Sequence, residues 1–268
     1  LLRSMYKPPQ DQRADARPEV GKPGSDPDLL RRQLLDEAGV DYALMLPRTV
    51  RNYLDPELDA DMHRASNDWM AATWLSRHNP HGRYRGTIRV SVLDPQRAAA
   101  EIEHWAGAPN LVAVQVGNAA PAAYGSRFFD PIWAAAARHG LPVVMHFDNV
   151  GLPPIAGPVG YVQQYMEYHA AGHPMAYCAH LVSLVCSGAF ERFPDLRFVF
   201  VEGGFAWLGS LVWRLDKLWA QLRHEVPELK LKPSEYVFRN TRFSSQPLED
   251  IGRGNQLVNL FELMEADR

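Results

Sequence analysis

Two side chains suited to metal or proton chemistry stand directly after short, largely apolar segments. His146 follows residues 141–145, and Glu202 follows residues 196–201. A neutral imidazole is a good ligand for zinc or manganese, and a desolvated carboxylate can take up a proton near neutral pH. Apolar runs without alternation predict strands buried on both faces of a parallel sheet. Because polar residues at the carboxyl ends of such strands form active sites, we expect both side chains to face one site.

Each of these residues also has a structural interpretation. His146 is either a metal ligand or a core histidine whose ring nitrogens bond to backbone groups. Glu202 either moves a proton or ligates the metal, or it forms a structural ion pair with Arg214 or Arg242. One histidine cannot hold a catalytic metal alone, because such sites normally use about three protein ligands.

Two further polar residues follow apolar segments and belong to the same predicted face. Arg48 comes after residues 42–46, and Gln246 comes after residues 241–245. Arg48 is a candidate for holding a substrate carboxylate by a two-point contact, although a surface arginine beside a turn explains it as well. Gln246 is expected to contact or support the substrate.

A long connection, residues 150–174, is rich in glycine and proline. A long loop at this end of a strand is more often a wall or lid of a site than filler. His169 and His173 lie in it, and His180 follows it. Any one of the three can reach the site as an acid or a substrate contact, and two are expected to be structural. We select His180, together with Glu167, as additional candidates.

The whole chain alternates predicted strands with predicted helices. No glycine-rich G-x-G-x-x-G fingerprint accompanies the alternation, and polar residues instead recur at strand after strand. A site assembled from many strand ends is typical of a (β/α)8 TIM barrel. We therefore expect an incomplete barrel with strands one and eight missing. The strands are expected at 42–46, 88–92, 111–116, 141–146, 196–201 and 241–245, with helices at about 29–38, 56–77, 95–105, 130–139, 175–190, 207–222 and 255–265.

Composition narrows the classes of protein that fit. The 268 residues suit one domain, 1–268, with an excursion at about 150–174. A net charge of −3 argues against a nucleic-acid or anionic-membrane partner. Cys178 and Cys186 would lie roughly 12 Å apart on a helix, too far for a disulfide. Together with the lack of a long apolar run, this predicts a cytoplasmic protein without a membrane span.

Residues 188–204, Gly-Ala-Phe-Glu-Arg-Phe-Pro-Asp-Leu-Arg-Phe-Val-Phe-Val-Glu-Gly-Gly, resemble the core signature of a known family. This is the amidohydrolase-related family, which includes enzymes of the aminocarboxymuconate-semialdehyde decarboxylase type. Residues 213–216, 233–236 and 246–247 resemble its continuation. The resemblance implies a (β/α)8 barrel with one divalent metal, zinc or manganese, at the carboxyl ends of the strands.

The resemblance assigns roles to two residues and leaves two positions empty. His146 matches the metal-ligand histidine at the end of the family's fifth strand. Glu202 stands where the family commonly has a histidine that transfers protons at the end of the sixth strand. The family's H-x-H or E-x-H pair on strand one and its aspartate on strand eight have no counterpart in these 268 residues.

The sequence therefore predicts a metal-dependent hydrolase or decarboxylase that acts on a small carboxylated or cyclic substrate. His146 would hold the metal, Glu202 would move the proton, and Arg48, His180 and Gln246 would contact the substrate. The alternative is a catalytically inactive barrel that serves as a binding or scaffold protein. A third, weaker hypothesis is a metal-free lyase that uses Glu202 alone. The family resemblance and the apolar last helices predict a homodimer.

Overall fold

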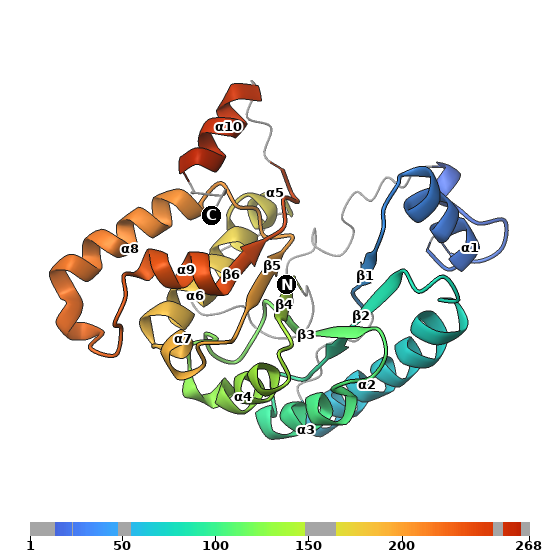
Figure 1. The fold of residues 1–268 in the computed structure, drawn as a ribbon, viewed down its shortest axis with the longest axis horizontal. Coiled ribbons are helices and arrows are strands. Elements are labelled where there is room, and N and C mark those ends of the chain that lie inside the picture. The colour runs from blue at the N-terminus through green and yellow to red at the C-terminus, as the bar shows by residue number, and fades with distance from the viewer. Residues whose placement is uncertain (1–13, 23, 48–54, 148–164, 249–253, 264–268) are drawn as a thin grey trace.

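The computed structural model describes residues 14–22, 24–47, 55–147, 165–248 and 254–263. Within them, six parallel strands form one sheet in which each strand pairs with the next along the chain. The sheet curls, and helices lie outside its curve (Figure 1). The strands are β1 Ala43–Met45, β2 Tyr84–Arg89, β3 Leu111–Gly117, β4 Val143–His146, β5 Phe198–Val201 and β6 Thr241–Phe243.

Helices connect the strands. The α-helices are α1 Pro27–Leu30, α2 Pro56–Trp69, α3 Pro95–Trp105, α4 Asp130–Arg138, α5 Tyr165–Glu167, α6 His173–Cys186, α7 Ala189–Arg192, α8 Leu208–Leu222, α9 Pro233–Asn240 and α10 Gly254–Leu263. Wider π-helical turns at Arg31–Glu37, Met70–Arg77 and Tyr168–Gly172 extend or precede three of them, and 3-10 turns occur at Ala14–Ala16, Arg127–Phe129 and Arg223–Glu225. This is the strand–helix alternation that parallel pairing requires.

Three of the helices begin with the same local device, an aspartate followed by a proline. Asp26, Asp55 and Asp94 each accept hydrogen bonds from two backbone N–H groups of the first turn of α1, α2 and α3. Proline suits the next position because its fixed φ is helical and its missing N–H would have no partner there. The Asp-Pro pairs therefore mark the residues at which α1, α2 and α3 begin.

Residues alternate between the two faces of the sheet. Val143 and Met145 of β4 and Phe198 and Phe200 of β5 belong to the apolar core that packs against the helices. Because successive side chains of a strand point to opposite faces, His146 lies on the other, inner face.

The inner face carries polar side chains that are nevertheless buried. Thr87 and Arg89 of β2 and Gln115 of β3 are each no more than 1% exposed, and Arg89 and Gln115 are register partners. The hydroxyl of Thr87 donates to the side-chain carbonyl of Gln115 at 2.6 Å. A polar interior of this kind is consistent with a barrel whose site opens at the carboxyl ends of the strands.

The predicted fold is confirmed as an incomplete (β/α)8 barrel, and β1 and β6 are not paired with each other in the described part of the chain. One strand was predicted in the wrong place. The second strand is Tyr84–Arg89, four residues earlier than the predicted 88–92. Its first residues include Arg85 and Gly86, which resemble a turn. A Cβ at Gly86 would lie 2.6 Å from a methyl of Leu75, so this side chain would have to shift for a larger residue.

Helix α6 starts two residues before its predicted beginning. His173 is its first residue and Pro174 lies in its first turn, so His173 and His180 share this helix. Cys178 and Cys186 lie on α6 as well and form no disulfide. Most of the predicted excursion, residues 148–164, lies outside the described residues. None of the helices that the structure describes is long and apolar enough to span a membrane.

Candidate metal and proton-transfer site

His146 ends strand β4 and is 6% exposed. Its Nδ1–H donates to the backbone carbonyl of Phe147 at 2.9 Å. Because a carbonyl oxygen can only accept, this contact assigns the hydrogen of the neutral ring to Nδ1. The lone pair of Nε2 is thereby directed away from the backbone. Metal-ligating histidines usually show this arrangement, in which a backbone or carboxylate acceptor fixes the second nitrogen.

Glu202 follows strand β5 directly, and its Oε2 lies 2.7 Å from Nε2 of His146. The side chains of Glu202 and His146 are 28% and 8% exposed, so the contact is partly buried. Strands β4 and β5 are neighbours in the sheet, with His146 paired in register with Val201. The predicted meeting of the imidazole and the carboxylate at adjacent strand ends is confirmed.

The contact joins two groups that both accept hydrogen bonds. With its hydrogen on Nδ1, His146 presents a lone pair at Nε2, and an ionised Glu202 presents a second one. A proton or a cation must lie at this contact, since two facing lone pairs repel each other. An imidazole nitrogen and a carboxylate oxygen are ligands that suit zinc or manganese, so the pair fits part of a divalent metal site. The described residues contain no group of three histidine, cysteine or acidic side chains able to hold a metal.

The backbone of Glu202 is held from helix α6. The Nε2–H of His173 donates to the backbone carbonyl of Glu202. Burial lowers the pKa of His173 from 6.5 to about 4, although its hydrogen bond to that carbonyl acts in the opposite direction. His173 is therefore a neutral donor near pH 7. His169 stacks beside His173 with ring centroids 5.9 Å apart.

Comparison with known proteins identifies the family. The family model described as amidohydrolase matches residues 7–267. The chain belongs to the amidohydrolase family.

Solved structures of similar proteins agree with this assignment. The 5-carboxyvanillate decarboxylase LigW from Sphingomonas paucimobilis shares 26% identity and a TM-score of 0.73, over 87% of this chain and 68% of that one. An amidohydrolase from Mycobacterium avium subsp. paratuberculosis K-10 shares 24% and 0.73, over 93% and 66%. The 2,6-dihydroxybenzoate decarboxylase from Rhizobium shares 20% and 0.69, over 89% and 74%. This amidohydrolase thus spans about two thirds to three quarters of these chains, in a family of enzymes.

His180 of this amidohydrolase has no nitrogen left for a substrate. Its Nε2–H donates to the carbonyl of Asn118 at 2.9 Å, and its Nδ1 accepts from the N–H of Tyr124 at 3.2 Å. It is fully buried, and burial lowers its pKa to about 4. These contacts make His180 a neutral structural link between α6 and the segment after β3, so its selection as a substrate contact was wrong.

Two of the other predicted site residues are exposed, and one lies outside the described part of the chain. Arg48 lies outside the described residues. Gln246 is exposed, and its backbone carbonyl accepts a hydrogen bond from the hydroxyl of Ser244 at 3.4 Å. Glu167 is exposed at the end of α5. Arg242, the structural alternative as a partner for Glu202, donates to the carbonyls of residues 238 and 241.

Two residues near the site were missed by the sequence analysis. Arg89 donates to the carbonyl of Pro47 at 3.0 Å, and Gln115 donates to the same oxygen at 3.4 Å. They fix the chain directly before Arg48. The sequence contained a sign of this role, because Arg89 is a charged residue inside an apolar run. The strand was predicted to start four residues late, so Arg89 was not recognised as its last residue.

Proposed function

We propose that this amidohydrolase removes the carboxylate of a small hydroxylated aromatic acid with the help of one divalent metal ion. The observation that carries the proposal is the 2.7 Å contact between His146 and Glu202 at the carboxyl ends of β4 and β5. Two of the similar structures are decarboxylases of such acids, 5-carboxyvanillate and 2,6-dihydroxybenzoate. A decarboxylase needs a group that delivers a proton to carbon, and the carboxyl group of Glu202 is available for this role at the carboxyl end of β5.

His146 would hold the metal through Nε2, since Nδ1 is committed to the carbonyl of Phe147. Similar structures of 5-carboxyvanillate decarboxylase from Novosphingobium aromaticivorans and of a dihydroxybenzoic acid decarboxylase from Polaromonas contain manganese. When bound, a divalent ion supplies positive charge that polarises a substrate oxygen.

Glu202 would act as the proton donor. Decarboxylation breaks the bond between the ring carbon and the carboxylate, carbon dioxide leaves, and the ring carbon takes up one proton. Protonated Glu202 gives that proton and becomes a carboxylate, which is then reprotonated from water.

Arg48 would hold the carboxylate of the substrate. A guanidinium binds a carboxylate through two parallel hydrogen bonds. Support comes from its neighbour Pro47, whose carbonyl is fixed by both Arg89 and Gln115. Arginine at this position would orient the acid, while the proton transfer takes place at Glu202.

The test is a decarboxylation assay with 2,6-dihydroxybenzoate and 5-carboxyvanillate in the presence of Mn²⁺. We expect release of carbon dioxide and, in D₂O, one deuterium at the vacated ring carbon. E202Q should lower kcat by about 10²- to 10⁴-fold, the range of general acid–base catalysis, when it is assayed at saturating Mn²⁺. E103Q is the matched control, because Glu103 is an exposed carboxylate paired with Arg138 and His139 on the helical surface.

Two results would contradict the proposal. Full activity of E202Q would remove Glu202 from the reaction. Protein purified without chelator that contains no metal, and that also binds no added Mn²⁺, would favour the second candidate function, a binding or scaffold barrel. That candidate is favoured by one observation, the lack of a third metal-ligand side chain among the described residues. Hydrolysis of a C–N or C–O bond would appear as product formation without carbon dioxide.

A further inference from the structure

The turn after β5 is held by an unusual set of side-chain contacts. Three consecutive backbone carbonyls each accept a hydrogen bond from the ring of an aromatic or imidazole side chain. The pairs are Tyr177 Oη–H to Val201 at 2.7 Å, His173 Nε2–H to Glu202, and Trp207 Nε1–H to Gly203 at 3.0 Å. All three donors are neutral and largely apolar, so they satisfy the carbonyls without bringing a charge close to the carboxylate.

Glu202 also uses its backbone N–H, which donates to the hydroxyl of Ser244 at 3.0 Å. Ser244 follows β6, and its own N–H donates to the carbonyl of Phe200 at 2.9 Å. Its position therefore depends on the sheet and not on its hydroxyl. We call Ser244 together with the ring donors Tyr177, His173 and Trp207 the Glu202 clamp.

The clamp surrounds a residue in a strained conformation. The φ angle of Glu202 is +64°, in the left-handed region that is unfavourable for a non-glycine residue. Such conformations persist where the surroundings over-determine them, and they cluster at functional sites. Glycine would adopt this angle freely, so the presence of glutamate here indicates that its side chain is required.

Helix α6 brings its two donors into line. His173 and Tyr177 are four residues apart and therefore lie on one side of the helix. The ring of Tyr177 packs against the turn so closely that a Cβ on Gly203 would approach it to 2.5 Å. This close contact fixes the distance between the turn and helix α6. A larger residue at position 203 would push the turn away from the helix.

We infer that the Glu202 clamp is a positioning device: it holds the backbone of Glu202 in the left-handed conformation and so directs the carboxylate to Nε2 of His146. Its consequence for catalysis rests on the proposed function, whereas the contact between the carboxylate and the imidazole is a property of the metal-free protein. In a standard extended conformation, the side chain of residue 202 would leave the strand in another direction.

The first experiment records the imidazole ¹⁵N spectrum of metal-free protein with labelled histidine at one fixed pH. S244A should move the His146 Nε2 resonance in the same direction as E202Q does, because both remove the carboxylate from the ring. S244T, which keeps a hydroxyl, should restore the wild-type resonance. S183A is the matched control, since the hydroxyl of Ser183 also accepts a backbone N–H, that of Gly125 at 3.1 Å. It should leave the His146 resonance unchanged.

The second experiment measures Mn²⁺ affinity by titration calorimetry. S244A should weaken binding by about tenfold, the lower limit for residues that orient metal ligands. In a double-mutant cycle, S244A should cost nothing further once Glu202 is already glutamine, because the serine acts through Glu202. Y177F should weaken Mn²⁺ binding as S244A does. An unchanged unfolding midpoint of Y177F shows that the substitution acts on the turn and not on the stability of the whole protein.

The outcomes separate the two proposals. A His146 resonance that is the same in wild type and S244A, while E202Q moves it, would overturn the clamp and leave it as a purely structural anchor. Additive effects of S244A and E202Q on Mn²⁺ affinity would do the same. A failure to bind Mn²⁺ with an intact spectroscopic response to S244A would instead overturn the metal site of the proposed function and keep the clamp.

Discussion

Two buried histidines of this protein differ in how much hydrogen-bonding capacity remains after folding. His146 uses one ring nitrogen on a backbone carbonyl and presents the other to Glu202. His180 uses both nitrogens on backbone groups, one as a donor and one as an acceptor. Their exposures, 6% and 0%, hardly distinguish them. The partners therefore decide that one ring is available for chemistry and the other is part of the framework.

The framework histidine makes stability depend on pH. Burial lowers the pKa of His180 from 6.5 to about 4 in the folded protein, whereas the unfolded chain keeps the ordinary value. Between these two values the unfolded chain binds more protons, so the free energy of unfolding falls as the pH is lowered from about 6.5 to about 4. The full loss from this group is about 3 kcal/mol. His173, with its pKa also lowered to about 4 by burial, acts in the same direction.

Urea denaturation at several pH values tests this prediction. H180Q should reduce the slope of unfolding free energy against pH between 4 and 6.5, because glutamine can donate and accept without titrating. H104Q is the control, since His104 is exposed on α3. An unchanged slope in H180Q would mean that protonation of His180 does not oppose folding.

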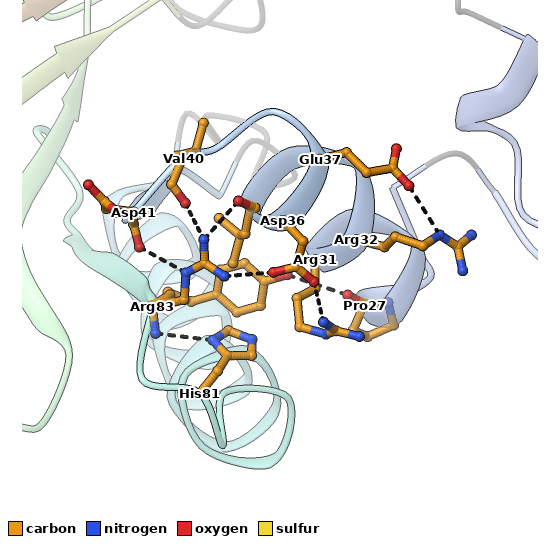
Figure 2. A network of polar contacts seen from close by, with 11 residues as sticks. Pro27, Arg31, Arg32, Asp36, Glu37, Val40, Asp41, His81 and Arg83 are labelled. Atoms are coloured by element: carbon orange, nitrogen blue, oxygen red, sulfur yellow. Dashed lines mark hydrogen bonds and ion pairs between the residues drawn. The ribbon is translucent and has the colours of Figure 1, made fainter.

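One arginine connects helix α1 and the π-helical turn after it, Arg31–Glu37, to strand β2 (Figure 2). Arg83 directly precedes β2, and its guanidinium donates to the carbonyls of Leu35, Val40 and Asp41 at 2.8, 2.5 and 3.1 Å. It also pairs with the carboxylate of Asp36 at 2.7 Å. A cation at the end of a helical segment satisfies carbonyls that have no helical partner. The contact fixes how this segment packs at the start of β1 and β2.

R83A should therefore destabilise the protein by about 2 kcal/mol, because hydrogen bonds to charged groups contribute roughly 1.5–3 kcal/mol. The measurement is chemical denaturation at neutral pH. R97A is the control, since the carboxylates that pair with Arg97, those of residues 57, 61 and 94, are exposed or half-exposed. The substitution should cost at most about 1 kcal/mol. Equal losses in the two variants would show that the backbone contacts of Arg83 contribute nothing specific.

Local patterns predicted most of the elements, and the exceptions have identifiable causes. β4 and β5 lie in continuous apolar segments that end at polar residues, so both strands and their ends were evident from the sequence. β2 was placed late because Arg85 and Gly86 interrupt its apolar pattern, although Gly86 packs closely on Leu75 inside the strand. Because of this error, Arg89 was not predicted to lie at the end of the strand.

Contacts between distant segments of the molecule were only partly predictable from the sequence. The pairing of His146 with Glu202 was predictable because both follow strands, and parallel strand ends meet at one edge. The contacts of Glu202 with Ser244 and His173 join residues 42 and 29 positions apart through side chains of ordinary type. Nothing in their local patterns marks them. They become visible only when α6 and β6 are placed beside β5.

The whole molecule should respond to metal binding. Any ion that binds the folded protein and not the unfolded chain raises the free energy of unfolding, by about 2.7 kcal/mol at one hundred times its dissociation constant. For a chain of this size, the increase corresponds to an unfolding midpoint about 5–10 °C higher. Mn²⁺ should produce this shift in wild type and none in H146A. H139A is the control, because His139 lies on the surface beside Glu103. Equal shifts in wild type and H146A would place the bound ion elsewhere, and no shift in wild type would favour a barrel that binds partners without catalysis.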